Sequence, residues 1–217
     1  KTGGASKRHF SRKHDIIFFY SKTENYKFNP QQEKSFMMHK YGFKKSDFKI
    51  DEETGLQYSM VYMKDVWEIP SVGSADSQRL GYPTQKPEKL LERIIISSSD
   101  KGDLILDPFC GCGTTVSVAE QLDRQWIGID ITTLALNLIK HRLKKQFVKN
   151  IKINLDGIPK DISGAKELAL KNRFEFQYWA LSLINAIPSK KKTADEGIDG
   201  FIIVRTSETN FEKILVQ

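Results

Sequence analysis

The clearest hydrophobic pattern lies in the middle of the chain, where short apolar runs alternate with longer segments of helical periodicity. In segment 133–147, Leu134, Leu138, Ile139 and Leu143 recur on one face, as in an amphipathic helix. The same reasoning predicts strands at 104–106, 126–130 and 151–155 and helices at 114–122 and 133–147. Strands and helices that alternate at this spacing indicate a parallel, doubly wound α/β sheet.

The segments before this run carry weaker patterns. The apolar run Ile16–Tyr20 predicts a buried strand, and segment 64–70 predicts a short extended piece that ends at a proline. Residues 23–62 are polar and aromatic without a clear hydrophobic period, so we make no firm prediction of a helix or strand there. Pro87 suits the first turn of a helix that continues through Ser97.

Behind the central run, residues 156–166 contain many helix and strand breakers and predict a linker. A second, smaller α/β unit would then cover 167–217, with a helix at 174–186 and strands at 201–205 and 214–217. The first domain would cover 1–155. The chain begins with a lysine and ends inside a strand pattern, so we expect it to be part of a longer protein.

The net charge of +7 is concentrated in the first quarter of the chain. Residues 1–49 contain 12 Lys and Arg against 4 Asp and Glu, interleaved with aromatic residues. This composition is typical of a surface that contacts nucleic-acid phosphates, although a solvated charged face has the same composition. We therefore expect nucleic acid as a partner of segment 1–62, with Lys7, Arg8, Arg12 and Lys13 as the candidate contacts.

The two cysteines and the apolar runs limit the setting. Cys110 and Cys112 are one residue apart, which excludes a disulfide framework and favours a reducing, cytoplasmic environment. The longest apolar runs are too short to span a bilayer, so we expect no membrane association.

The stretch "DPFCGCGTT", residues 107–115, joins a predicted strand to a predicted helix. Asp107 falls at the carboxyl end of the strand, where open α/β sheets bind ligands, and Gly111 and Gly113 allow positive φ and close approach of the backbone. Thr114 can cap the next helix. A P-loop would need Gly-Lys-Ser/Thr, and a zinc site would need a second pair of ligands. A glycine turn without a ligand remains an alternative.

The next strand also ends in an acid. Asp130 closes "RQWIGID", 23 residues after Asp107. An acid at that place suits hydrogen bonds to the hydroxyls of a ribose. The turn lacks the Gly-x-Gly-x-x-Gly spacing, which disfavours an NAD-type Rossmann enzyme.

Together these segments carry a resemblance. "GYPTQKPEKLLERII", then "GDLILDPFCGCGTT", then "WIGIDI" is similar to the permuted, beta-type DNA methyltransferases that methylate the exocyclic amino group of adenine (N6) or cytosine (N4). The resemblance covers about residues 1–150. It implies a partial Rossmann-like methyltransferase sheet whose cofactor, S-adenosylmethionine, binds within 80–155, and double-stranded DNA as the partner of segment 1–62. The cofactor-binding residues that it implies are Thr84, Gln85, Lys86, Pro87, Asp107, Pro108, Phe109, Gly111, Gly113, Thr114 and Asp130.

One part of the family pattern is missing. The family's catalytic tetrapeptide, Ser/Asp/Asn-Pro-Pro-aromatic, holds the target amino group of a base that is flipped out of the duplex. No Pro-Pro pair occurs in these 217 residues. The resemblance therefore implies the cofactor-binding half of a methyltransferase that is inactive alone. The alternative is a catalytically inactive DNA-binding module with a nuclease-like tail.

The C-terminal unit carries a second, weaker resemblance. "FEFQYWALSLINA", "KKTADEGIDGFIIV" and "KILVQ" are similar to a truncated restriction-endonuclease-like domain of the Mrr kind. The resemblance implies nuclease-like roles for Glu175, Asp199 and Gln217, with Mg²⁺ held in part by Asp199 to activate water. An exposed helix acid and a turn aspartate are the alternative. A nuclease-like unit behind a methyltransferase would indicate a restriction–modification or phage-defence setting.

Overall fold

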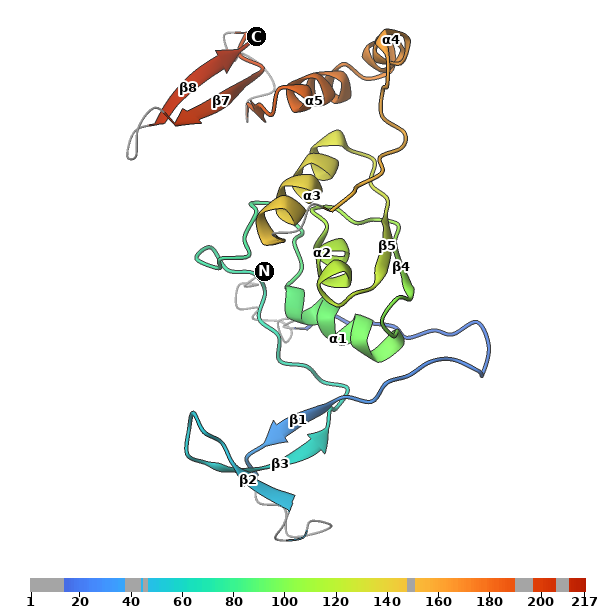
Figure 1. Ribbon diagram of the computed structural model, residues 1–217, viewed down its shortest axis with the longest axis vertical. Coiled ribbons are helices and arrows are strands. Elements are labelled where there is room, and N and C mark those ends of the chain that lie inside the picture. Colours follow the sequence, from blue (N-terminus) through green and yellow to red (C-terminus); the bar gives the residue numbers. More distant parts are fainter. Residues whose placement is uncertain (1–13, 38–43, 45–46, 148–150, 190–196, 206–210) are drawn as a thin grey trace, which may run out of the picture.

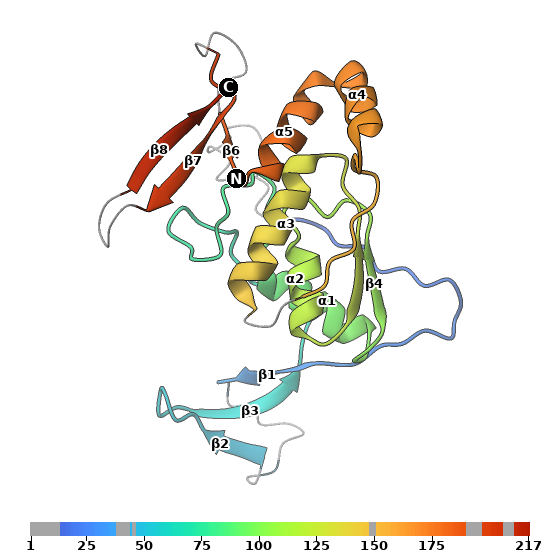
Figure 2. The same cartoon turned by 45° about the horizontal axis from the view of Figure 1, so that its top comes forward.

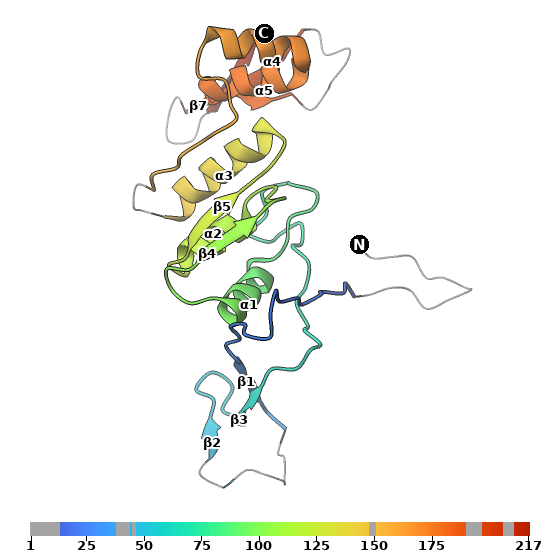
Figure 3. The same cartoon turned by 90° about the vertical axis from the view of Figure 1, so that its right-hand side faces the viewer.

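The computed structural model describes residues 14–37, 44, 47–147, 151–189, 197–205 and 211–217. Three groups of elements follow one another along the long axis of the molecule (Figures 1 and 3). At one end lies a small antiparallel sheet of order β1-β3-β2, formed by β1 (Gln32–Ser35), β2 (Phe48–Ile50) and β3 (Gln57–Tyr62). Among the described residues, no helix is long and apolar enough to cross a lipid bilayer.

The central group is a parallel strand pair with three helices. Its elements are α1 (Glu88–Ser98), β4 (Leu104–Asp107), α2 (Thr114–Gln121), β5 (Gln125–Gly128) and α3 (Thr133–Gln146). β4 and β5 pair in parallel, with Asp107 opposite Gly128. The five elements lie where the periodicity predicts them, to within about one or two residues.

The helices cover one face of the strand pair (Figure 2). Ile105 and Trp126 point to this face and pack against a buried cluster of Ile95, Val118 and Ala119. The residues between them point to the other face, where Leu104, Leu106, Ile127 and Ile129 are 48–58% exposed. Mixed α/β architecture is thus confirmed, and among the described residues the helices cover one face of a two-stranded parallel sheet.

The third group contains α4 (Ile162–Lys171), α5 (Arg173–Leu183) and an antiparallel sheet of order β6-β7-β8. Its strands are β6 (Ile187–Pro188), β7 (Gly200–Arg205) and β8 (Phe211–Val216). α5 and the two long strands agree with the predicted elements. α4 begins inside the predicted linker, because Asp161 caps it by accepting a hydrogen bond from the Gly164 N–H.

Two predicted strands are wrong. Segment 16–20 forms no strand, and its apolar side chains are 53–84% exposed. Segment 151–155 also forms no strand, although Ile151 and Ile153 pack against the core cluster that contains Leu143. Both segments have the composition of strands, but neither has a partner strand among the described residues. Segment 64–70, predicted only as a short extended piece, forms neither a helix nor a strand, and β1, β2 and β3 were not predicted.

Candidate cofactor site

The turn from β4 to α2 is organised by its own aspartate. Asp107 Oδ1 accepts from the Phe109 N–H at 3.0 Å, and Asp107 Oδ2 accepts from Thr115 Oγ1 at 2.5 Å. Thr115 lies in the first turn of α2, so one carboxylate ties the strand end to the start of the helix. The first N–H groups of α2 have no partner inside the helix and lie at the carboxyl end of the sheet.

The two glycines of the turn have positive φ, 50° at Gly111 and 72° at Gly113. A Cβ on Gly113 would lie 2.5 Å from Ile139 Cγ1, and a Cβ on Gly111 would lie 3.0 Å from a ring carbon of Tyr82. The sequence predicted that these glycines permit close approach to a ligand. In the structure they permit close approach of the chain's own side chains.

Asp130 connects the second strand end to the same turn. Its Oδ2 accepts from the Gly111 N–H at 2.9 Å. Its Oδ1 accepts from the N–H and the hydroxyl of Thr132, both at 3.0 Å. The two carboxylates predicted from the sequence therefore lie at the ends of adjacent parallel strands and are joined through the backbone of the glycine turn.

A third segment, residues 78–88, lies against the turn. Burial raises the pKa of Tyr82, and the nearby charge of Asp130 adds to the effect. The side chain of Gln85 accepts from the Leu80 N–H at 2.9 Å and donates to the Gln78 carbonyl at 2.5 Å. Gln85 therefore shapes this segment from within. Tyr82 was missed as a site residue, because its contact with Gly111 crosses 29 residues of chain.

A buried arginine joins the first helix to the turn. Arg142 of α3 is 5% exposed. Its guanidinium donates to Glu88 Oε1 at 2.8 Å, to Thr114 Oγ1 at 3.0 Å and to the Cys112 carbonyl at 3.4 Å. Glu88 directly follows Pro87, so this contact links the segment 84–87 to the turn. Arg142 was also missed, since nothing in a helical pattern marks a buried charge.

The remaining predicted residues are exposed at this edge. Phe109 is 88% exposed, and Thr84, Lys86 and Pro108 are also exposed. Lys86 Nζ lies 3.9 Å from Asp15 Oδ2. Ile131, which follows Asp130, is 94% exposed and was not predicted. An exposed aromatic ring and an exposed β-branched side chain thus follow the ends of two neighbouring strands.

The turn also contains the two cysteines, both buried and unpaired. Burial raises the pKa of the Cys110 thiol to about 11, and the charges of Asp107 and Asp130 act in the same direction. The thiolate form is therefore strongly disfavoured at neutral pH.

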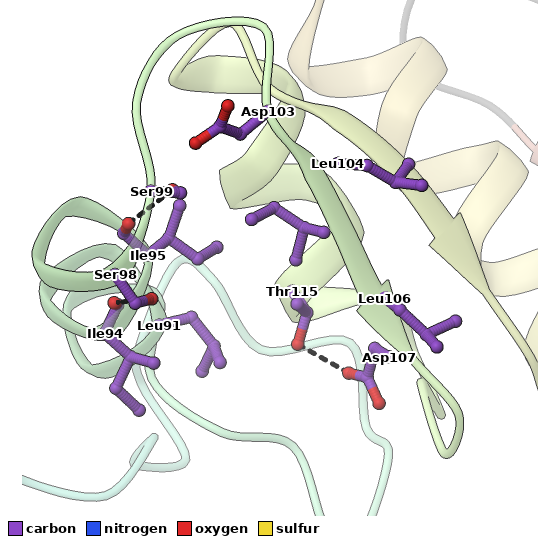
Figure 4. A pocket seen from close by; sticks show the side chains of 11 residues that line it. Leu91, Ile94, Ile95, Ser98, Ser99, Asp103, Leu104, Leu106, Asp107 and Thr115 are labelled. Atoms are coloured by element: carbon purple, nitrogen blue, oxygen red, sulfur yellow. Dashed lines mark hydrogen bonds between the residues drawn. The ribbon is translucent and has the colours of Figure 1, made fainter. Parts of the chain in front are cut away.

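A groove of about 550 Å³ runs between α1 and β4 (Figure 4). Most of its wall is formed by Leu91, Ile94, Ile95 and the residues of β4, and it extends to Asp103 at the amino end of the strand. Asp107 and Thr115 line its other end. The groove therefore meets the candidate site at one end, and elsewhere its apolar side chains are accompanied by Ser98, Ser99 and Asp103.

Of the residues predicted to bind DNA or to have nuclease-like roles, the structure describes only the second group. Lys7, Arg8, Arg12 and Lys13 lie outside the described residues. Glu175 Oε2 accepts from the backbone N–H of Thr133 at 2.9 Å, whereas Asp199 Oδ1 accepts from Gln177 Nε2 at 2.7 Å.

The third nuclease-like residue, Gln217, packs against Gly197. In the part of the chain that the structure describes, no three His, Cys, Asp or Glu side chains come together in a way that could hold a metal ion. The nuclease-like assignment of 167–217 stays a prediction.

Comparison with known proteins bears on the region that contains the site. The model of a family described as DNA methylase, of the N6/N4 methyltransferase type, matches residues 1–141. The chain belongs to this DNA methylase family. The family match includes α1, the glycine turn and Asp130, and it ends before α4.

Two curated relatives show how far the similarity extends. The type II methyltransferase M2.MboI of Moraxella bovis is 45% identical over 102 residues, which is 44% of this chain and 37% of that protein. The DNA adenine methyltransferase YhdJ of Escherichia coli is 32% identical over 157 residues, or 65% of this chain and 48% of that protein. The matched part thus spans about a third to a half of the length of these two relatives.

Two solved structures also match parts of the chain. The M1.HpyAVI–SAM complex is 29% identical with a TM-score of 0.31, and the match covers 41% of this chain and 49% of that chain. The cytosine-N4-specific PvuII DNA methyltransferase is 20% identical with a TM-score of 0.34, covering 55% and 46%.

Proposed function

We propose that this chain provides the S-adenosylmethionine-binding part of a DNA methyltransferase that acts on the exocyclic amino group of adenine or cytosine. The observation that carries the proposal is the pair of carboxylates at the ends of β4 and β5, which Thr115 and Gly111 hold within the glycine turn. Family membership supports the reaction class, and the arrangement of this edge supports it as the binding place of the cofactor.

The residues at this edge suit an adenosyl group. Asp130 Oδ2 accepts the Gly111 N–H, and a carboxylate oxygen can accept a second hydrogen bond, here from a ribose hydroxyl. The exposed ring of Phe109 and the exposed side chain of Ile131 offer apolar surface to a planar base. When bound, S-adenosylmethionine supplies the sulfonium methyl group that is transferred.

In this proposal, some residues of segment 84–87 contact the cofactor and others fix the conformation of the segment. Thr84 and Lys86 are exposed and able to contact the cofactor. Gln85 fixes the backbone of the segment through Leu80 and Gln78. Pro87 precedes α1 with φ −63° and ψ 139° and so sets where the helix begins.

Calorimetric titration with S-adenosylmethionine tests the proposal. We expect saturable binding by the wild-type chain and about tenfold weaker binding by Phe109→Ala, since stacking of a base on an aromatic ring contributes about 1–3 kcal/mol. Because Phe109 is 88% exposed, folding should be unchanged. The matched control is Leu170→Ala, which removes a side chain that is 91% exposed on α4. No saturable binding by the folded chain, or equal affinity of Phe109→Ala and wild type, would overturn the proposal.

Methyl transfer by this chain alone is a separate question. We propose that it does not occur, because the 217 residues contain no Pro-Pro-aromatic tetrapeptide to hold the target amino group. The measurement is incorporation of a labelled methyl group into double-stranded DNA. Labelled DNA would show that residues of this chain complete the catalytic site by themselves.

A further inference from the structure

A carboxylate from the C-terminal helices lies at the start of α3. Glu175 Oε2 accepts from the backbone N–H of Thr133 at 2.9 Å, across 42 residues of sequence. Thr133 is the first residue of α3, and the first turn of α3 contains no acidic residue of its own. The carboxylate of α5 therefore occupies the place that a first-turn acid would take, and α3 and α5 pack side by side (Figure 2).

Glu175 is itself held in place. It lies in the first turn of α5, and its N–H donates to the side chain of the N-cap residue Asn172 at 3.2 Å. The carboxylate thus lies near the N-termini of two helices, α5 and α3. A negative charge is favourable at each, because the unpaired N–H groups there carry partial positive charge.

Hydrogen bonds continue from this contact to the glycine turn. Thr132, the N-cap of α3, donates from its N–H and from its hydroxyl to Asp130 Oδ1. Asp130 Oδ2 accepts from the Gly111 N–H at 2.9 Å. We call residues 130–133 the Asp130 loop. One end of this loop is fixed by the glycine turn and the other by Glu175.

We infer that Glu175 is a positioning residue for the Asp130 loop, through which the C-terminal unit controls the geometry of the cofactor edge. The inference about the loop stands on the hydrogen bonds alone, and its extension to cofactor affinity rests on the proposed function. Coupling between two sites is reciprocal. A cofactor that orders Asp130 therefore also strengthens the docking of α5 on α3.

Amide hydrogen exchange of the full chain, followed by NMR without cofactor, tests the inference. Glu175→Ala should speed exchange of the Gly111 and Thr132 amides about fivefold or more, the lower end of typical coupling between sites. Glu175→Gln should restore near wild-type exchange, because its amide oxygen can still accept from Thr133. The matched control is Glu167→Ala, which removes an exposed carboxylate from α4.

A second variant removes the same hydrogen bond from the other side. Thr133→Pro deletes the donor, and proline is well tolerated at the first position of a helix after an extended residue such as Thr132. It should speed exchange of the Gly111 and Thr132 amides as Glu175→Ala does. Wild-type exchange of these two amides in both variants would overturn the inference, even if S-adenosylmethionine binds normally.

Cofactor titration of the same variants separates the two proposals. If the wild-type chain binds S-adenosylmethionine, Glu175→Ala should bind it about fivefold more weakly and Glu175→Gln nearly as well as wild type. If the wild-type chain binds none, the proposed function fails, while the exchange rates still decide whether Glu175 positions the loop.

Discussion

Removal of either partner of the Arg142–Glu88 pair should destabilise the chain, and the two removals should differ in size. Glu88→Ala leaves a guanidinium that is 5% exposed without its counter-charge. Arg142→Met leaves a carboxylate whose side chain is 25% exposed and which lies in the first turn of α1. The carboxylate can regain water and is favoured by the helix N-terminus, whereas the buried guanidinium has neither compensation.

The magnitudes follow from this asymmetry. An uncompensated buried charge costs about 3–5 kcal/mol, so Glu88→Ala should lower the free energy of unfolding by that amount. Arg142→Met should cost about 2–3 kcal/mol, mainly from the lost hydrogen bonds to Glu88 and Thr114. The double variant should cost less than the sum by about 2 kcal/mol, because neither charge is then left unpaired.

Urea unfolding followed by circular dichroism measures these differences. Glu92→Ala is the control, since it removes an exposed carboxylate from the same helix and should change stability by less than about 0.5 kcal/mol. The reasoning fails if Arg142→Met costs as much as Glu88→Ala, or if the two effects are additive.

Three other predictions concern single contacts. Gly113→Ala should lower the free energy of unfolding by about 3 kcal/mol, because of the positive φ at this position and the clash with Ile139. In urea unfolding, Gly113→Ala should cost less in a chain that already carries Ile139→Ala than in the wild-type chain. The Lys34 ammonium, together with hydrogen bonds from Thr54, lowers the pKa of Asp51 to about 2, so these contacts should stabilise the β1–β3–β2 sheet above about pH 4 and be lost as the pH falls toward 2. A pH series of NMR spectra should show a smaller step in Lys34→Met, in which the Thr54 contacts remain. Cys110 should resist iodoacetamide at pH 8 until the chain unfolds, and alkylation of the native protein at the rate of a free thiol would contradict the burial and the raised pKa.

The central elements could be predicted from sequence because their signals are local. Helical periodicity and the strand–glycine–helix order place β4, α2, β5 and α3. The apolar run Ile16–Tyr20 has the composition of a strand, but a strand exists only where another pairs with it, and composition does not contain that information. The start of α4 was not predicted, because it lies in a segment with many helix and strand breakers, although Asp161 is a typical N-cap.

The residues of the candidate site also fall into those with local sequence signals and those with long-range contacts. Asp107, Asp130 and the two glycines could be predicted because they come directly after strands, and the position of a strand end determines what these residues can contact. Tyr82, Arg142 and Glu175 reach the turn or the Asp130 loop across 29, 30 and 42 residues of sequence. The nuclease-like role of Glu175 was predicted from the local sequence around it, whereas the contact that it makes with Thr133 spans 42 residues of sequence.

These long-range contacts lead to one last expectation about the turn. Arg142 is buried and cannot touch a cofactor, so any effect of Arg142→Met on S-adenosylmethionine affinity must act through the geometry of the turn. Phe109→Ala removes contact surface and leaves the turn intact. If the turn is preorganised, as its contacts to Asp107, Asp130 and Arg142 indicate, both variants should weaken binding, but only Arg142→Met should also lower stability. Normal affinity in a folded Arg142→Met chain would show that the turn reaches its binding geometry without the arginine.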